Sequence, residues 1–297
     1  MDETTIATVA MQATHDVDLS LKTHLDHIDQ AADAGADLVV FPEISLQGYP
    51  SILDRRNRTS VLTDVYRTAE VVPAGPSVSQ IAAKAAEREI YVVFGLTEAG
   101  PQPAVVYNTA VLAGPAGYLG KYRKVHVSIS EQAIWRRGND WPVFNTPFGR
   151  IGILICYDKM WPEACRELLF RGADIFVMPT AWRYSEDDHD PDTNVSCHQY
   201  RLFDQVRAAE NQRWFVSSNF YGNFEGSDFF GFSQIVDPLG RIVASSGTAS
   251  GLVMATVDIR AGIAEAAATL NGARLVRDRR PETYQAIRGE IPITIDG

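Results

Sequence analysis

The chain has 297 residues, of which 45% are hydrophobic and 22% are charged, as is ordinary for a water-soluble globular protein. Its formal net charge of −10 argues against binding to nucleic acids or to anionic membranes, since both require basic surface patches. The sequence contains no long apolar run and no basic-then-apolar leader, so we expect neither a membrane span nor a signal peptide.

The cysteines indicate in which compartment the protein is expected, and the absence of a linker indicates how many domains it has. The three cysteines Cys156, Cys165 and Cys197 are odd in number and do not resemble a disulfide framework, which favours a reducing compartment and a cytoplasmic location. No low-complexity linker divides the chain. We therefore expect a single domain over residues 1–272 and a C-terminal tail over 273–297.

The first half of the chain alternates apolar, β-rich runs with segments of helical periodicity. Strands are expected at 5–11, 38–41, 90–96, 105–112 and 118–122. Amphipathic helices are expected at 19–34 and 77–89, and the polar segment 55–70 fits a surface helix.

The second half continues the alternation. Strands are expected at 149–156, 173–179, 214–219, 232–237, 241–244 and 251–257, and helices at 162–171 and 194–211. Strands that alternate with helices in this way predict layered α/β architecture.

Two short stretches of the chain resemble each other. GADLVVFPE at 35–43 and GADIFVMPT at 172–180 share Gly-Ala-Asp, four apolar residues and a proline. A match of this length can arise by chance, but it also fits two similar halves that each deliver a residue at the same strand end. In that case Thr180 and Trp182 border the same pocket as Glu43.

Cys156 stands at the end of the apolar run 151–155, just before a turn into the helix that starts at Pro162. Backbone N–H groups at such a turn can lower the pKa of a thiol and can hold an oxyanion. A buried structural cysteine is the alternative, because free cysteines are among the most buried residues.

A nucleophile needs a base and a group that stabilises developing charge. Glu43 ends the expected buried strand 37–43 and is a candidate base, with a pKa that burial would raise. Lys124 lies in a polar strand end, and its ammonium could stabilise an oxyanion and help hold Cys156 as a thiolate. A capping or salt-bridged Glu43 and a solvated Lys124 are the structural alternatives.

Three stretches carry a family resemblance in the family's order: FPEISLQGYP (41–50), KYRKVHVSISEQAIWRRGN (121–139) and GRIGILICYDKMWPEACREL (149–168). Together they resemble the carbon–nitrogen hydrolase (nitrilase) superfamily. The resemblance implies a four-layer α-β-β-α sandwich and a Glu43–Lys124–Cys156 triad. It also implies a second glutamate, Glu131, beside the lysine, although Glu131 could instead serve a helix start near Ser128 or Ser130. The resemblance implies no metal and no organic cofactor. It also implies that the protein forms a homodimer or a higher homo-oligomer.

Two stretches of the sequence resemble family branches that act on different classes of substrate. SEQAIWRRGN (130–139) resembles the nitrilase branch, whereas Cys156-Tyr157-Asp158 resembles amidases and N-carbamoyl amide hydrolases. We give the second more weight because Tyr157 adjoins the reacting carbon. The expected reaction is thus hydrolysis of a small amide or N-carbamoyl compound through a cysteine thioester, with nitrile hydrolysis as the alternative.

Aromatic residues after the expected strands predict an apolar or aromatic acyl pocket. The candidate substrate-binding residues are Tyr49, Trp135, Tyr157, Trp182 and Arg183. Arg183 could bind a substrate carboxylate with two hydrogen bonds, and a surface arginine is the alternative.

Other classes of function are less favoured. A non-catalytic relative would not need all three of the triad residue types. A thiol redox protein would be expected to carry a C-x-x-C motif, which is absent. Asp and His residues between 187 and 198 match no metal-ligand spacing and fit a solvated acidic loop. That loop, residues 184–193, directly follows Trp182 and is a candidate cover for the pocket.

Overall fold

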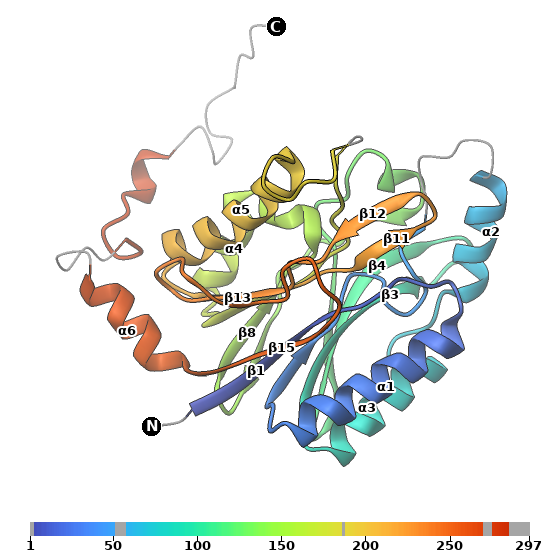
Figure 1. Ribbon diagram of the computed structural model, residues 1–297, viewed down its shortest axis with the longest axis horizontal. Helices are drawn as coiled ribbons and strands as arrows, with labels where there is room; N and C mark the ends of the chain where they lie inside the picture. The colour runs from blue at the N-terminus through green and yellow to red at the C-terminus, as the bar shows by residue number, and fades with distance from the viewer. Residues whose placement is uncertain (1–2, 51–57, 186–187, 270–274, 285–297) are drawn as a thin grey trace, which may run out of the picture.

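A computed structural model describes residues 3–50, 58–185, 188–269 and 275–284. Within these residues one sheet has seven strands (Figure 1). Its strand order is β15 (Gly251–Asp258), β1 (Glu3–Ala10), β2 (Leu38–Val40), β3 (Tyr91–Ala99), β4 (Val106–Gly114) and β5 (Gly117–Arg123), and β6 (Trp135–Arg136) pairs with β4.

The second large sheet has six described strands and packs face to face against the first. Its order is β14 (Ile242–Ser245), β13 (Gln234–Val236), β10 (Trp214–Ser218), β9 (Ile175–Pro179), β8 (Gly149–Ile153) and β7 (Val143–Thr146). A separate ribbon joins β11 (Tyr221–Phe224) to β12 (Ser227–Phe230).

Helices cover the outer face of each sheet (Figure 1). The first sheet carries α1 (Val17–Asp33) and α3 (Pro76–Glu87), whose apolar stripes pack on alternate strand residues. The second sheet carries α4 (Pro162–Phe170) and α5 (Val195–Asn211). The remaining α-helices of the described residues are α2 (Arg58–Thr68) and α6 (Ile259–Thr269).

The central core lies between the two sheets. Val40 and Val93 of the first sheet and Ile153 and Val177 of the second are completely buried there. Together with the helical layers, this core gives the four-layer α-β-β-α sandwich that the family resemblance implied. No helix of the described residues has both the length and the apolar character that crossing a bilayer requires.

The two similar sequence stretches have the same structural role. Asp37 accepts a 2.8 Å hydrogen bond from the N–H of Thr5 on the neighbouring strand, and Asp174 accepts one of 3.0 Å from the N–H of Arg150. Each aspartate thus fixes the start of a central parallel strand, β2 in one sheet and β9 in the other.

These two strands end side by side across the sandwich. The N–H of Glu43, after β2, donates a 3.2 Å hydrogen bond to the carbonyl of Thr180, after β9. The strand ends therefore bring both residues to one place, as the internal similarity predicted.

Several boundaries differ from the sequence expectation. β8 ends at Ile153, so Cys156 does not end a strand but begins a 3₁₀ helix, Cys156–Met160. No element was expected at β6, β7, β11, β12 or α6, which are short or partly exposed and lack clear periodicity. Residues 55–57 of the expected surface helix, and 273–274 and 285–297 of the expected tail, lie outside the described residues.

Candidate active site

The turn at Cys156 has an unusual backbone conformation. Cys156 has a φ of +47°, in the left-handed region that residues with side chains seldom adopt. The chain leaves β8, turns sharply at this residue and enters the 3₁₀ helix Cys156–Met160. Cys156 as a residue is partly exposed, and it lines a cavity.

Asp158 holds this turn in place. Its Oδ2 accepts hydrogen bonds from the N–H of Ile155 at 2.9 Å and from the hydroxyl of Tyr122 at 2.7 Å. Its Oδ1 accepts one from the N–H of His126 at 2.8 Å and lies 2.9 Å from Nδ1 of the same residue. The carboxylate therefore ties the Cys156 turn to the segment that carries Lys124, two residues before His126.

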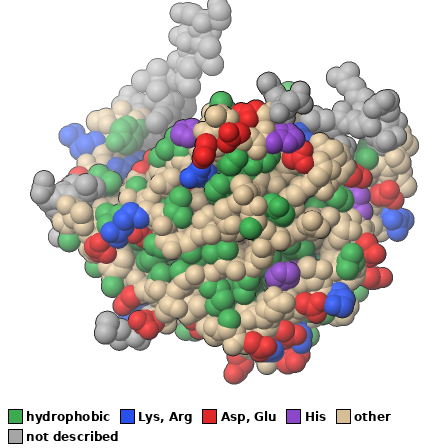
Figure 2. Space-filling view, viewed as in Figure 1, with side chains coloured by type: hydrophobic (Ala, Val, Ile, Leu, Met, Phe, Trp, Pro, Cys, Tyr) green, Lys and Arg blue, Asp and Glu red, His purple; other side chains and the backbone are tan. Residues whose placement is uncertain are grey.

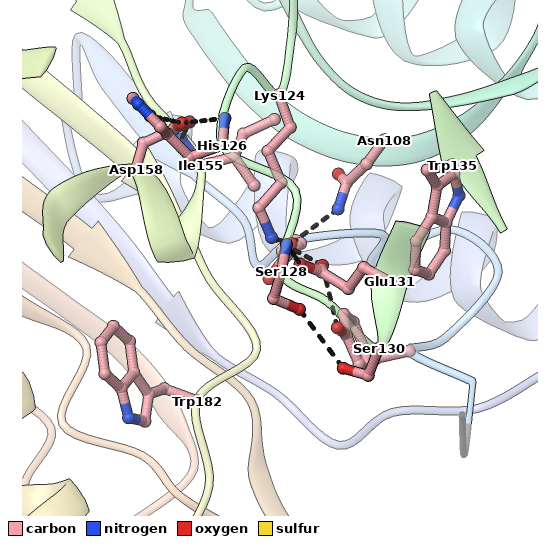
Figure 3. Close-up of polar contacts among 12 residues, drawn as sticks. Asn108, Lys124, His126, Ser128, Ser130, Glu131, Trp135, Ile155, Asp158 and Trp182 are labelled. Carbon is pink, nitrogen blue, oxygen red and sulfur yellow. Dashed lines mark hydrogen bonds and ion pairs between the residues drawn. The ribbon is translucent and has the colours of Figure 1, made fainter. Parts of the chain in front are cut away.

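Lys124 follows directly after β5 and is 1% exposed. Its Nζ donates to Oε1 of Glu43 and to Oε1 of Glu131, both at 2.7 Å (Figure 3). Burial alone lowers the pKa of a lysine, but the charges of Glu131 and Glu43 outweigh it and hold the pKa of Lys124 well above its usual value. Lys124 is therefore a fixed positive charge rather than a base.

Glu43 is completely buried, and its two carboxylate oxygens are treated differently. Oε1 accepts hydrogen bonds from Nζ of Lys124 at 2.7 Å and from Nδ2 of Asn108 at 2.6 Å. Oε2 is buried and has no hydrogen-bond partner among the described residues. Burial raises the pKa of Glu43, and Lys124 partly offsets this effect. Such a carboxylate is suited to accept a proton near neutrality.

The thiol of Cys156 is not held as a thiolate. Burial and the negative charge of Glu43 raise its pKa to about 12, and the positive charge of Lys124 lowers it by less. Lys124 therefore acts in the expected direction, but the pKa of the thiol as a whole is raised rather than lowered. The thiol must lose its proton as it reacts, which requires a neighbouring base.

Glu131 begins a short 3₁₀ helix, Glu131–Ala133, and is 2% exposed. Its Oε1 accepts from Lys124 and also from the hydroxyl of Tyr49 at 3.0 Å, while its Oε2 accepts from the N–H of Ser128 at 2.8 Å. Contact with the lysine and a structural role near Ser128 were considered as alternatives for Glu131. The carboxylate makes both kinds of contact, to Lys124 and to the backbone of its own loop.

Two candidate substrate-binding residues lie behind Glu131. Tyr49 donates to its carboxylate, and Trp135 is 1% exposed, in a core cluster with Ile44 and Val106. The two rings pack at a centroid distance of 5.9 Å. In Figure 3, Trp135 and Trp182 lie on opposite sides of the Lys124 ammonium. Tyr49 and Trp135 therefore support Glu131 from the core side, and their contact with a substrate stays a prediction.

The other three candidates line a cavity of ≈ 460 Å³ that contains Cys156. Tyr157, Trp182 and Arg183 form part of its wall. Arg183 donates one hydrogen bond, of 2.6 Å, to Oγ of Ser227, and no carboxylate of the described residues lies within ion-pair distance of it.

The wall of this cavity carries charged side chains of both signs, Arg183 and Asp228 among them. His189 and Asp228 also line it, and Nδ1 of His189 lies 3.5 Å from the Asp228 carboxylate. Figure 2 shows acidic and histidine side chains gathered along the edge of the molecule where α5 and β12 lie in Figure 1. No group of three His, Cys, Asp or Glu residues in the described ranges is arranged to hold a metal ion.

A second buried ion pair lies below the Cys156 turn. Nζ of Lys159 donates to Oδ1 of Asp204 at 2.7 Å and to the carbonyl of Tyr200 at 3.0 Å, and it lies 4.6 Å from the ring centroid of Trp182. Arg207 adds a 2.8 Å hydrogen bond to the carbonyl of Lys159. This cluster fixes the floor on which the turn and Trp182 rest.

The sequence analysis missed Asn108, Tyr122, Asp158 and Lys159 as parts of the site. Asp158 had a usable signal, because an acidic residue three positions after the N-cap of a helix, here Ile155, commonly accepts a hydrogen bond from the N-cap N–H. Asn108 had none, since it is one polar position within the strand β4 and contacts Glu43 across 65 residues of sequence.

Comparisons with known proteins agree on the family. A profile of the carbon–nitrogen hydrolase family matches residues 5–266. A probable nitrilase of Schizosaccharomyces pombe is 31% identical over 238 residues, which cover 78% of this chain and 79% of that protein. A nitrilase of Pyrococcus abyssi is 29% identical over 259 residues, 86% of this chain and 89% of that protein.

Solved structures agree on the fold. An amidase of Nesterenkonia sp. AN1 superposes with a TM-score of 0.75 at 24% identity, over 96% of this chain and 99% of that one. Saccharomyces cerevisiae Nit3, a member of the nitrilase superfamily, superposes with a TM-score of 0.74 at 23% identity, over 99% of this chain and 96% of that one.

Proposed function

The chain belongs to the carbon–nitrogen hydrolase family, and we propose that it hydrolyses the C–N bond of a small amide or N-carbamoyl compound through a thioester on Cys156. The observation that carries the proposal is the free, buried Oε2 of Glu43 in a site that also holds a neutral thiol and the Lys124 ammonium. A base, a nucleophile and an electrostatic stabiliser are the three groups that acyl transfer needs.

In the first half-reaction Glu43 takes the thiol proton as the sulfur attacks the substrate carbonyl carbon. The carbonyl electron pair moves onto oxygen, where the Lys124 ammonium and the N–H of Tyr157 stabilise it. The intermediate then collapses, the C–N bond breaks, and Glu43 returns the proton to the departing nitrogen as ammonia leaves. Cys156 now carries the acyl group as a thioester.

In the second half-reaction water replaces the amine. Glu43 removes a proton from water as its oxygen attacks the thioester carbon. The C–S bond breaks, the carboxylic acid leaves, and the sulfur regains a proton from Glu43. Glu131 accepts from Lys124 throughout and holds the ammonium beside the base.

Nitrile hydrolysis is the alternative reaction, because curated relatives of the chain include nitrilases. The same thiol could add to a nitrile carbon, and the resulting thioimidate would need water to release ammonia. The sequence after the nucleophile, Tyr157-Asp158, supports the amide reading.

Ammonia release from amides, N-carbamoyl amino acids and nitriles, with Cys156→Ala as control, tests the proposal. We expect release from amides or carbamoyl compounds, loss in the variant, and an acyl adduct on the intact protein by mass spectrometry. Release from nitriles alone would assign the alternative reaction. Activity that survives Cys156→Ala would rule out the mechanism.

We also propose that the preferred substrate carries a carboxylate that pairs with Arg183. Its guanidinium lines the cavity, and one hydrogen bond to Ser227 leaves other donors for a ligand. Arg183→Gln should raise KM for a carboxylated amide by about 10-fold or more, since a hydrogen bond to a charged group contributes about 1.5–3 kcal/mol. A neutral amide of the same length is the control, and its KM should stay within about twofold. An equal change for both substrates would contradict the pairing.

A cytoplasmic location and a homodimer or higher homo-oligomer stay predictions. Light scattering after size exclusion at micromolar concentration tests the assembly, and a monomer would reject it.

A further inference from the structure

Asn108 is the side chain that contacts the proposed base but belongs to none of the three motifs. It lies on β4 and is 1% exposed. Its Nδ2 donates to Oε1 of Glu43 at 2.6 Å, and its backbone carbonyl accepts from the N–H of Lys124 at 2.8 Å. One strand residue thus contacts both the base and the lysine.

We propose that Asn108 is the positioning residue for Glu43, which holds Oε1 engaged so that Oε2 stays free to take the proton of Cys156. The inference rests on the role of Glu43 proposed above. It goes beyond that role because it names a residue outside the triad, Asn108, that determines which oxygen of Glu43 is hydrogen-bonded and which accepts the proton.

A carboxylate cannot by itself distinguish its two oxygens, since a half-turn of the group exchanges them. The surroundings must therefore do so. Lys124 also donates to Oε1 of Glu43, but its ammonium is shared with Glu131. Unlike a planar amide, an ammonium on a flexible stem does not fix which carboxylate oxygen it contacts. Asn108 is a planar amide fixed to a central strand, and it can meet only one oxygen at a time.

The orientation of the amide is also determined. If the Asn108 amide were turned over, its Oδ1 would face Oε1 of Glu43 at hydrogen-bond distance, and two acceptors would repel each other. In the observed orientation Oδ1 is buried without a hydrogen-bond partner among the described residues. An unsatisfied amide oxygen is destabilising, so the contact to Glu43 is kept at the expense of the amide's other end.

Asn108 also affects the acidity of the base. Burial raises the pKa of Glu43, and the hydrogen bond from Asn108 is among the contacts that lower it. Loss of the hydrogen bond should therefore raise the pKa of Glu43 further. The acid limb of kcat/KM would then move to higher pH, because less of the base is ionised at a given pH.

The test compares Asn108→Leu with Thr109→Val. Thr109 is the next residue on β4, is also completely buried, and donates a 2.7 Å hydrogen bond to Glu98, which belongs to a separate charged cluster. Both variants lose one buried hydrogen bond to a glutamate, so a merely structural effect should appear in both. In Asn108→Leu we expect kcat to fall about 100-fold, as for misplacement of a catalytic group, with KM within about threefold and the acid limb at higher pH. Thr109→Val should keep the kcat and acid limb of the parent.

A second readout does not need turnover. The rate at which iodoacetamide alkylates Cys156 depends on removal of its proton, so Asn108→Leu should slow alkylation and move its pH dependence upward. If the amide substrate has been misassigned but Glu43 is the base, the alkylation result still holds, which separates failure of this inference from failure of the proposed function. An unchanged alkylation profile in folded Asn108→Leu would overturn the inference.

Asn108→Asp is the second variant, in case Asn108→Leu does not fold. It keeps the shape of the side chain, and its carboxylic acid can donate to Glu43 only while protonated. Activity should therefore persist at low pH and decline as the pair loses its shared proton. Activity of Asn108→Asp with the pH profile of the parent would equally overturn the inference.

Discussion

Two buried lysines near Cys156, Lys124 and Lys159, belong to ion clusters that differ in their net charge and in how fully their carboxylates are hydrogen-bonded. Lys124 is 1% exposed and contacts two carboxylates, Glu43 and Glu131, both at 2.7 Å. Lys159 is 0% exposed and contacts one, Asp204, at 2.7 Å. The first cluster carries one more negative charge than positive, whereas the second is balanced.

The acceptors differ as well. Both oxygens of Asp204 are occupied, Oδ1 by Lys159 and Oδ2 by the hydroxyl of Ser217 at 2.6 Å and the amide of Gln234 at 2.7 Å. In the Lys124 cluster Oε2 of Glu43 has no partner among the described residues. A carboxylate whose two oxygens both accept hydrogen bonds is held in one arrangement, while a buried carboxylate oxygen without a partner is poised to take a proton.

The acidities follow the same division. Burial lowers the pKa of Lys159, and the single charge of Asp204 offsets this only in part. Burial would lower the pKa of Lys124 too, but two carboxylates reverse the direction. The comparison therefore predicts that removing charges from the Lys124 cluster changes activity, whereas removing them from the Lys159 cluster changes stability.

The largest expected contrast is between Glu43→Gln and Asp204→Asn. Glu43→Gln removes the open acceptor and should lower kcat/KM by up to about 10⁴-fold, the upper range for a general base. Its stability should hold or rise, because a desolvated charge is lost and Lys124 keeps Glu131 as partner. Asp204→Asn leaves Lys159 unpaired and should lower the free energy of unfolding by about 3–5 kcal/mol.

Urea denaturation and ammonia release measured on the same samples check this contrast. Equal destabilisation of the two variants would show that the clusters do not differ in the way described.

The next contrast replaces each of the two lysines by methionine. Lys124→Met should lower kcat by about 10²–10³-fold, as for loss of one oxyanion donor. It should also slow thiol alkylation, because Lys124 lowers the pKa of Cys156. Lys159→Met should mainly lower the midpoint of thermal unfolding, with the activity of the folded fraction within about 10-fold of the parent. A larger loss of activity in folded Lys159→Met than in Lys124→Met would contradict the assignment.

These contrasts mark what the sequence could and could not predict. The positions of Glu43 and Cys156 were predictable because each follows an apolar run that must be buried, and such runs deliver the residues after them to a sheet edge. Their proposed roles came instead from the family resemblance of the three motifs. The internal similarity even placed Thr180 beside Glu43, and the hydrogen bond between them confirms it.

The missed partners depend on the three-dimensional arrangement. Lys159 and Asp204 are 45 residues apart, and neither carries a local sign of burial. Trp135 shows another limit: its place in a core cluster with Ile44 and Val106 could not be read from the sequence, and its contact with a substrate stays a prediction. Composition does not determine which side of a short strand such as β6 faces a cavity.

A smaller effect concerns acidification, which should separate activity from folding. Glu43 must be ionised to act, so activity should be lost as pH falls through its pKa, which lies above the ordinary 4.5. Burial raises the pKa of Glu98, but hydrogen bonds from Arg123 and Lys121 outweigh it, so its pKa lies below 4.5. The stability that Glu98 contributes is present above its unfolded pKa and is lost only as pH falls through the lower, folded value.

Between these two values the protein should be folded and reversibly inactive. Circular dichroism and kcat/KM measured across the acid range check the window. Loss of the near-ultraviolet signal together with activity would contradict it.

The smallest contrast concerns one tyrosine from each cluster. The hydroxyl of Tyr49 donates to Glu131 at 3.0 Å, and that of Tyr200 donates to Ser217 at 2.9 Å. Tyr200→Phe should lower the free energy of unfolding by about 1 kcal/mol, the net contribution of one hydrogen bond, with activity within about twofold.

Tyr49→Phe should instead lower kcat/KM by about threefold to tenfold. Oε1 of Glu131 accepts from both Tyr49 and Lys124, so without the hydroxyl it attracts the ammonium more strongly. Lys124 then does less to lower the pKa of Glu43, and the acid limb should move slightly upward. Comparison of the acid limbs of the two variants checks this, and an upward shift in Tyr200→Phe alone would mean that the two clusters are coupled rather than distinct.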